Sequence, residues 1–471
     1  MVATTRRKAK ENACLVFHRF PPEVLLMVLE QLSDDKSSLL SCCLVSHFWL
    51  SAGRSFLFRT VTIHSKKDGP DNFDAFLRFL TRSGVGKHIW GITLSAPPLP
   101  EVTSPDEDMD AFVSAHYTPC SIDTVFRILH HTFCLRHLAL QLLRLTSTSA
   151  SSISSPSHPH RPTLDCLSFD DCVSDEDVRP LFDLICLFAD IGTLTIAYGP
   201  SVKAVPEGTL FGQRRCLPLI HRLEMYGENE ATTYGTFELL RRSGSLDRAL
   251  TQIELETTLG NVLTPFLTFL PEAATHLVHL NLIASNVFYE PPYDISYPPP
   301  FPFLPALRRL ELDIDLDADS YPPLCSRYVH RVIDVYADLL STPSSFPVLS
   351  RLDFHIDPGT LAPEILEYSA HWPIPVWHRL DEALMALPSI EMIIFELKDI
   401  PESMRGPLDP LVNRTTGSFV HYFFSRHMPA MYAKEIYQVV HDQEAAGYES
   451  DSESEDEDNP DGAPTADAAQ G

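Results

Sequence analysis

Residues 277–282 read Leu-Val-His-Leu-Asn-Leu, and this six-residue pattern decides the fold that we expect of the chain. Aliphatic residues occupy its first and fourth positions, and an apolar residue occupies its sixth. Side chains alternate between the two faces of a strand, so the fourth and sixth positions share one face while the third, fifth and seventh share the other. The segment therefore predicts a short strand that is buried on one side.

The pattern recurs along the body of the chain, and six consecutive steps between copies are 27 to 30 residues long. The copies are Ile89–Leu94, Leu135–Leu140, Leu164–Phe169, Ile191–Ile196, Ile220–Met225, Leu250–Leu255, Leu277–Leu282, Leu307–Leu312, Leu349–Phe354 and Ile390–Phe395. Helical periodicity lies between them at Ser121–Phe133, Asp175–Ala189, Thr236–Arg242, Val262–Leu270 and Arg327–Leu340. Alternating strands and helices predict an α/β repeat: a curved parallel sheet with outer helices.

Pattern and spacing together resemble the longer leucine-rich repeat, which gives one strand and one helix per copy. The terminal Asn of that signature occurs only at Asn286, so the repeats are degenerate. A non-repetitive α/β domain with evenly spaced strands is the alternative. We place the solenoid at residues 87–446, with inserted loops at 146–163 and 290–305. The second loop is rich in proline and aromatic residues, which could bind a partner or lie back on the solenoid.

The N-terminal region carries a second informative stretch, because residues 20–54 read FPPEVLLMVLEQLSDDKSSLLSCCLVSHFWLSAGR. Six consecutive apolar residues, 24–29, cover more than the full circumference of a helix. A segment of about 35 residues cannot bury that much apolar surface alone. One side must pack within a small helical unit and the other must meet something else, which indicates a docking module. An ordinary helical cap on the solenoid is the alternative.

The stretch resembles the F-box, the three-helix motif that attaches substrate-recognition subunits to the Skp adaptor of cullin–RING ubiquitin ligases. The matching residues are Pro21, Glu23, Val24, Leu25, Leu29, Leu32, Leu39, Leu40, Leu44, Val45, Ser46 and Trp49. Phe20 departs from the family, which more often has Leu there. The resemblance implies an F-box at residues 14–59 with adaptor contacts at Phe20, Pro21, Leu25, Leu29, Leu39, Leu40, Leu44 and Trp49.

Residues 60–86 predict a capping unit between the helical module and the solenoid. Alternation in Thr60–His64 favours a strand, and Phe73–Leu80 has its apolar residues on one helical face. Such a unit would close the end of the solenoid and couple it rigidly to the F-box. Rigid coupling would matter to a ligase, because a bound target must be held at a fixed distance from the transferring enzyme.

The chain is strongly acidic, with a net charge of −27 over 471 residues. This balance argues against nucleic acid or an anionic membrane as a partner. Residues 447–471 form an acidic, Ser-rich tail that we expect to be disordered. Ser450, Ser452 and Ser454 each precede an acid by three residues and resemble casein-kinase-type phosphorylation sites. A tail that only keeps the protein in solution is the alternative.

Cellular location is expected to be cytoplasmic, nuclear or both. The cysteines are scattered, which suits reduced thiols rather than a disulfide framework. No run of about 18 apolar residues predicts a membrane span. The terminus, residues 1–13, is basic and expected to be disordered; Arg6-Arg7-Lys8-x-Lys10 could be a nuclear import signal or a solvated end.

The predicted inner face of the sheet offers a candidate surface for a target protein. In three predicted strands an arginine lies two residues before an acidic residue: Arg222/Glu224, Arg309/Glu311 and Arg351/Asp353. Four other acidic residues have no arginine at that spacing: Glu254, Glu256, Asp313 and Glu396. We expect a basic or mixed-charge segment to bind there, although a functionally silent solvated face is the alternative. The predicted substrate-binding residues are Glu224, Tyr226, Glu254, Glu256, Glu311, Asp313, Asp353 and Glu396.

No catalytic, cofactor-binding or metal-ligating set is predicted. A phosphate-binding glycine loop and a nucleophile elbow are both missing from the sequence, and His130-His131 point about 100° apart on a helix. The resemblance implies a non-catalytic substrate adaptor of a Skp–cullin–F-box ligase, with cullin and RING subunits reached through the Skp adaptor. The alternative is a chaperone-like protein that binds basic partners through its acidic solenoid and tail. Together with the Phe-rich segment that follows it, FLFRTVTI at residues 56–63, the F-box looks like those of the large fungal F-box families.

Overall fold

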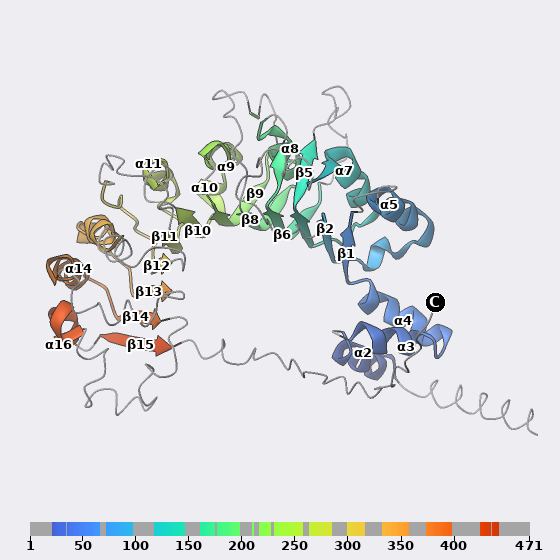
Figure 1. Cartoon of the computed structure of the whole chain (residues 1–471), viewed down its shortest axis with the longest axis horizontal. Coiled ribbons are helices and arrows are strands. Elements are labelled where there is room, and N and C mark those ends of the chain that lie inside the picture. Colours follow the sequence, from blue (N-terminus) through green and yellow to red (C-terminus); the bar gives the residue numbers. More distant parts are fainter. Residues whose placement is uncertain are drawn as a thin grey trace, which may run out of the picture.

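The chain folds as an α/β protein built on one large parallel sheet. The structure, a computed structural model, describes residues 21–33, 35–65, 72–97, 117–146, 161–174, 177–197, 210–211, 216–227, 230–257, 263–284, 299–315, 332–357, 374–397, 424–434 and 436–441. Figure 1 shows the strands following one another along the inner side of an arch, with helices on the outer side. The predicted curved parallel sheet with outer helices is confirmed.

The main sheet has twelve strands, all parallel, in an order that follows the sequence with β3, β5 and β7 left out. They are β1 (Thr60–His64), β2 (Gly91–Ser95), β4 (His137–Gln141), β6 (Thr163–Asp170), β8 (Asp190–Ala197), β9 (Leu219–Tyr226), β10 (Gln252–Thr257), β11 (His279–Ala284), β12 (Arg309–Asp315), β13 (Arg351–Asp357), β14 (Met392–Leu397) and β15 (Tyr437–His441).

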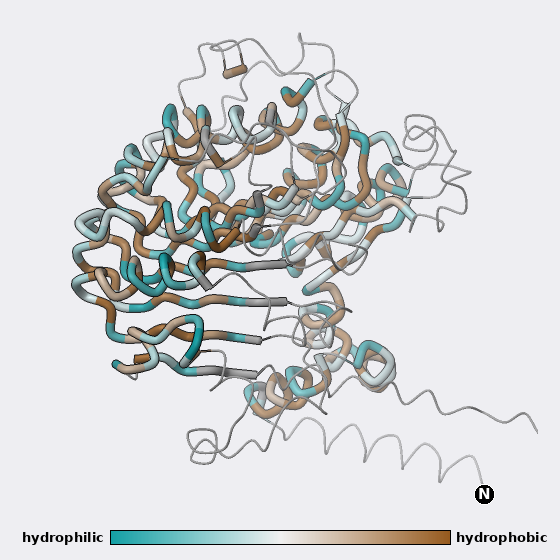
Figure 2. Tube along the Cα trace, turned by 60° about the vertical axis from the view of Figure 1, so that its left-hand side comes forward, coloured by the Kyte–Doolittle hydropathy of each residue, from teal (hydrophilic) through white to brown (hydrophobic). Residues whose placement is uncertain are grey.

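The pairing of neighbouring strands brings the copies of the six-residue pattern into alignment. The fourth position of each copy pairs with the fourth position of the next, from Ile92 and Leu138 through to Leu352 and Ile393. The fourth and sixth positions are buried in one continuous hydrophobic core between the sheet and the helices. Figure 2 shows the hydrophobic stretches along the strands in brown. The apolar pattern therefore stacks strand upon strand, as the sequence predicts.

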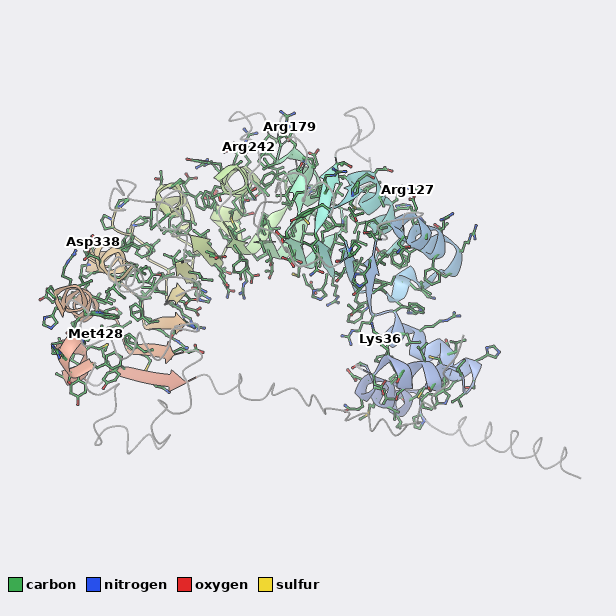
Figure 3. The ribbon with its side chains drawn as sticks, viewed as in Figure 1. Lys36, Arg127, Arg179, Arg242, Asp338 and Met428 are labelled. Carbon is green, nitrogen blue, oxygen red and sulfur yellow. The ribbon has the colours of Figure 1, made fainter. Side chains whose placement is uncertain are left out.

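Helices cover the outer side of the sheet. They are α5 (Asn72–Ser83), α7 (Ile122–His131), α8 (Arg179–Ile185), α9 (Glu230–Ser243), α10 (Ser245–Arg248), α11 (Leu263–Ala273), α14 (Ile374–Ala386) and α16 (Pro429–Lys434), with short 3-10 turns η1 (Val85–His88) and η2 (Pro343–Ser345). Residues 332–339 are also helical. Each helical segment that the periodicity predicts is found, with shifted ends. Figure 3 shows Arg127, Arg179 and Arg242 directed outward from this layer.

Two features of the sheets were not predicted. A small second sheet joins β3 (Thr118–Ser121), β5 (Leu143–Thr146) and β7 (Val173–Ser174) in parallel. Strand β15 extends the main sheet beyond the last copy of the pattern.

The end of the 290–305 insertion lies back on the body: Phe301 is buried and its ring meets that of Phe346 edge to face, 5.5 Å between centroids. This settles one of the two alternatives for the described part of that loop.

Three helices form a separate unit at the N-terminal end of the arch (Figure 1). They are α2 (Pro22–Gln31), α3 (Lys36–Cys43) and α4 (His47–Leu57). Leu25, Leu29 and Leu39 are fully buried in a small hydrophobic cluster of their own, against which Trp49 packs. The Ser46 side chain caps α4 by accepting a hydrogen bond from the Trp49 N–H.

A two-residue connection joins this unit to the sheet. Phe58 and Arg59 follow α4, and the Arg59 carbonyl accepts hydrogen bonds from the N–H groups of Trp90 and Gly91, at 2.8 and 2.9 Å. The guanidinium groups of Arg59 and Arg136 lie over the Trp90 ring, 4.6 and 5.0 Å from its centroid. A short linker with this many contacts fixes the direction in which α4 leaves the sheet.

Candidate functional site

Large hydrophobic side chains are exposed on the N-terminal helical unit. It spans only residues 22–57, yet it carries half of the exposed large hydrophobic side chains found among the described residues. Those on this unit are Val24, Leu26, Met27, Val28, Leu40, Leu44, Val45 and Phe48, and we call this set the apolar ledge. Met27 and Leu44 are the most exposed, at 65% and 87%. Such a set on so small a unit marks an interaction surface.

The predicted adaptor contacts divide between the inside and the outside of the unit. Leu25, Leu29 and Leu39 are 3%, 0% and 0% exposed, so they hold the helices together and do not face a partner. Their prediction as direct contacts is corrected, because they lie on the helix faces that pack against one another. Leu40 and Leu44 are exposed, as is Pro21, and Trp49 is half-buried. Phe20 lies outside the described residues.

Six members of the apolar ledge were not predicted as adaptor contacts. Val24, Leu26, Met27 and Val28 belong to the six-residue apolar run, Val45 lies in the α3–α4 turn and Phe48 lies at the start of α4. The run itself signals that some of its members must face outward. Which members do so depends on where α3 and α4 pack on α2, and the sequence does not give that.

The inner face of the main sheet is polar on strands β9 to β14. Its third, fifth and seventh pattern positions form three rows across the strands, as the pairing register shows. The third row is cationic at Arg222, Arg309 and Arg351, whereas the fifth and seventh rows carry most of the acids. The surface is thus positive toward the start of the strands and negative toward their ends.

On β9 and β10 the acids have partners across strands. Arg222 bridges Glu224 on its own strand, at 2.6 Å, and Glu254 on the next, at 3.2 Å. The Tyr226 hydroxyl donates to Glu254, and burial together with this hydrogen bond raises the pKa of Tyr226. Thr195 donates to Glu224 at 2.7 Å. Glu254 therefore has an Arg partner on a neighbouring strand, although it has none on its own.

A second network covers β11 to β14. Arg309 contacts Glu311 at 2.5 Å and Asp353 at 2.7 Å, and Arg351 also contacts Asp353, at 2.9 Å. His279 Nε2 lies 2.9 Å from Glu311. Burial opposes ionisation of Glu311, but the hydrogen bond from His279 and the charges of His279 and Arg309 hold its pKa below the ordinary value. His355 lies 3.1 Å from Glu396 and 4.0 Å from Asp313.

This geometry corrects part of the predicted substrate-binding set. Asp353 is 1% exposed and Glu311 8%, so both lie beneath the arginines and present little surface to a partner. Charged carboxylates are tolerated at such depth only when paired, which is what Arg309 and Arg351 provide. Glu256 differs: no ion pair to it is found among the residues that the structure describes. Glu224, Tyr226, Glu254, Glu256, Asp313 and Glu396 are partly exposed.

The described region offers little for covalent or metal chemistry. Its cysteines are all free, and burial raises the pKa of the Cys172 thiol to about 12. In the ranges given above, no group of three or more His, Cys, Asp or Glu side chains could hold a metal ion. The phosphorylation candidates Ser450, Ser452 and Ser454 lie outside the described residues, as do the basic terminus and the acidic tail.

Comparison of the chain with protein-family models gave no match, and comparison with curated proteins gave no significant match. Across the described segments, none of the helices combines the length and the apolar character that a membrane span requires. Any function given to the chain must therefore be argued from its residues and from their arrangement.

Proposed function

We propose that this chain is a non-catalytic substrate adaptor of a Skp–cullin–F-box type ubiquitin ligase. In this proposal α2–α4 are an F-box that docks a Skp-type adaptor, and cullin and RING subunits are reached through that adaptor. The strand–helix array is a degenerate leucine-rich repeat that presents a target protein. The order of residues between Pro21 and Trp49, described above as resembling the F-box, supports the choice of partner.

The apolar ledge is the observation that carries the proposal. A unit with its own core does not need Met27 and Leu44 exposed for its stability, and exposing them to water is unfavourable. An adaptor surface that covers them would remove that cost. The unit also lies at one end of the arch, joined to it by a short linker held at Arg59 and Trp90, so a docked adaptor would stand in a fixed direction from the sheet.

Co-expression with a Skp-type adaptor tests the docking. We expect the chain and the adaptor to elute as one complex in size-exclusion chromatography. The double change Met27→Glu and Leu44→Glu should abolish co-elution, because truncating or charging interface anchors typically costs about 2–4 kcal/mol each. Both side chains are already exposed, so the fold of the unit should persist by circular dichroism.

A matched control uses an exposed hydrophobic residue elsewhere. Phe133 follows α7 and is 76% exposed, so Phe133→Glu removes a similar apolar surface without touching the helical unit. Co-elution should survive this change. If the wild-type chain never binds the adaptor, or if the control and the double variant lose binding equally, the ligase role is rejected. The non-ligase alternative, a binder of basic proteins, would then account better for the acidic inner face.

A further inference from the structure

Strand β11 crosses the acidic part of the inner face without adding an acid of its own. In the pairing register Asn281 lies between Glu254 and Glu311, and Ile283 lies between Glu256 and Asp313. Neighbouring strands are about 4.8 Å apart, so the carboxylates on either side of β11 stand on strands about 10 Å apart. The result is a floor of one amide and one aliphatic side chain between two pairs of acids.

The two acids beside Asn281 and the two acids beside Ile283 differ in their ion-pair partners. Glu254 is held by Arg222 and Tyr226, and Glu311 by Arg309 and His279. Toward the strand ends the pairing changes: His355 Nδ1 lies 4.0 Å from Asp313, and Glu256 has no ion pair within the described ranges. Glu256, which lies beside Ile283 in the pairing register, is therefore the acid of this group whose charge is not offset by an ion pair in those ranges.

Asn281 is the second, independent observation. Its side chain is 94% removed from solvent, since the residue is 6% exposed, and its Oδ1 has no hydrogen-bond partner among the described residues. Leu280 and Leu282 are buried on the opposite face of β11, so Asn281 is directed to the inner face. A buried acceptor without a donor is unfavourable, and a ligand that supplied an N–H group would relieve this.

We propose that this slot, formed by Glu254, Glu256, Asn281, Ile283, Glu311 and Asp313, binds a cationic side chain, Lys or Arg, from a partner polypeptide. The aliphatic stem would lie on Ile283 and the charged head would donate to Asn281, Glu256 and Asp313. The proposal rests on the proposed function only in taking that partner to be the target protein. Charge complementarity selects a cationic group, because the four carboxylates of the slot outnumber the two arginines, Arg222 and Arg309, that pair with them.

Fluorescence anisotropy with a short labelled peptide of alternating lysine and glycine tests the slot on the full-length chain. We expect binding that weakens with added salt, and no binding of the same peptide with glutamine in place of lysine. Glu256→Gln and Asp313→Asn should each weaken binding about tenfold, because each removes a charged hydrogen-bond acceptor. Glu382→Gln on α14 and Asp247→Asn on α10 make the same charge changes at exposed outer positions and should leave affinity unchanged.

Asn281→Leu separates a binding role from a structural one. If Asn281 Oδ1 accepts a hydrogen bond from the bound peptide, this change should weaken the affinity for the lysine peptide about tenfold. The midpoint of thermal unfolding should stay the same or rise, since the change removes an unsatisfied buried acceptor. A fall of the midpoint together with affinity would overturn the role of Asn281. If the slot variants and the outer controls lose peptide affinity equally, binding comes from the overall negative charge of the chain, and the proposed slot is overturned.

The chain's own basic segment is the competing occupant. Changing Arg6, Arg7, Lys8 and Lys10 to Gln in the full chain should leave peptide affinity unchanged; markedly tighter binding would show that this segment fills the slot, which overturns a partner as occupant. Adaptor co-elution is read separately. The slot variants should keep it, so failure of the slot and failure of the ligase proposal are distinguishable.

Discussion

At the residue scale, Asp35 shows how one side chain starts a helix of the docking unit. Its carboxylate accepts hydrogen bonds from the N–H groups of Ser37 and Ser38, both at 3.0 Å, and from their hydroxyls. The Ser38 hydroxyl contributes most to lowering its pKa to about 2 from 3.8. Because the folded pKa is the lower one, the stabilisation is complete above pH 3.8 and is lost as pH falls toward 2. Asp35→Asn keeps an N-cap but removes this titration. NMR should place the Asp35 midpoint near 2; a midpoint near 3.8 would contradict the cap.

The acids of the inner face show, at the same scale, where sequence reasoning stops. Pairs two residues apart on one strand, such as Arg222 with Glu224, can be read from the sequence and are found. The contact between Arg222 and Glu254 joins residues 32 positions apart and exists only because β9 and β10 lie in register. The depth of a side chain likewise cannot be read from the sequence: Asp353 is buried and Glu254 is partly exposed, although both occupy the fifth pattern position of their strands.

At the element scale, η1 and α7 meet at Gly86. A Cβ atom added there would lie 1.9 Å from the His131 carbonyl oxygen, at the end of α7. Backbone cannot rotate away as a side chain can, so Gly86→Ala should push η1 from α7 and lower the free energy of unfolding by about 1–3 kcal/mol. Lys87→Ala, at an exposed position of the same turn, should change it little. Urea denaturation compares the two, and equal stability of the two variants would mean that this close approach is unimportant.

Strands could be predicted wherever their own six residues carry the apolar pattern. All the copies of the pattern between Ile89 and Phe395 form strands in the structure. Strand β15 was not predicted, because Tyr437 occupies the fourth position of the pattern and Lys434 the first. Its place in the sheet comes from pairing with β14 and from Phe424, whose ring lies 4.9 Å from that of Tyr437. Tertiary contact thus completes the sheet where the sequence pattern has faded.

At the scale of the whole molecule, two hydrophobic clusters divide the chain. One runs through the sheet and its helices, and the other holds only α2–α4, around Leu25, Leu29 and Leu39. So small a core should open more readily than the array.

Leu29→Ala should destabilise the helical unit by about 2–5 kcal/mol and speed hydrogen exchange in α2–α4, while exchange in β8–β12 stays slow. Leu282→Ala, in the large core, should affect the sheet instead. Exchange that rises along the whole chain in Leu29→Ala would mean one cooperative unit. If the units are separate, loss of adaptor binding in Leu29→Ala reports unfolding, and only ledge variants such as Met27→Glu report docking.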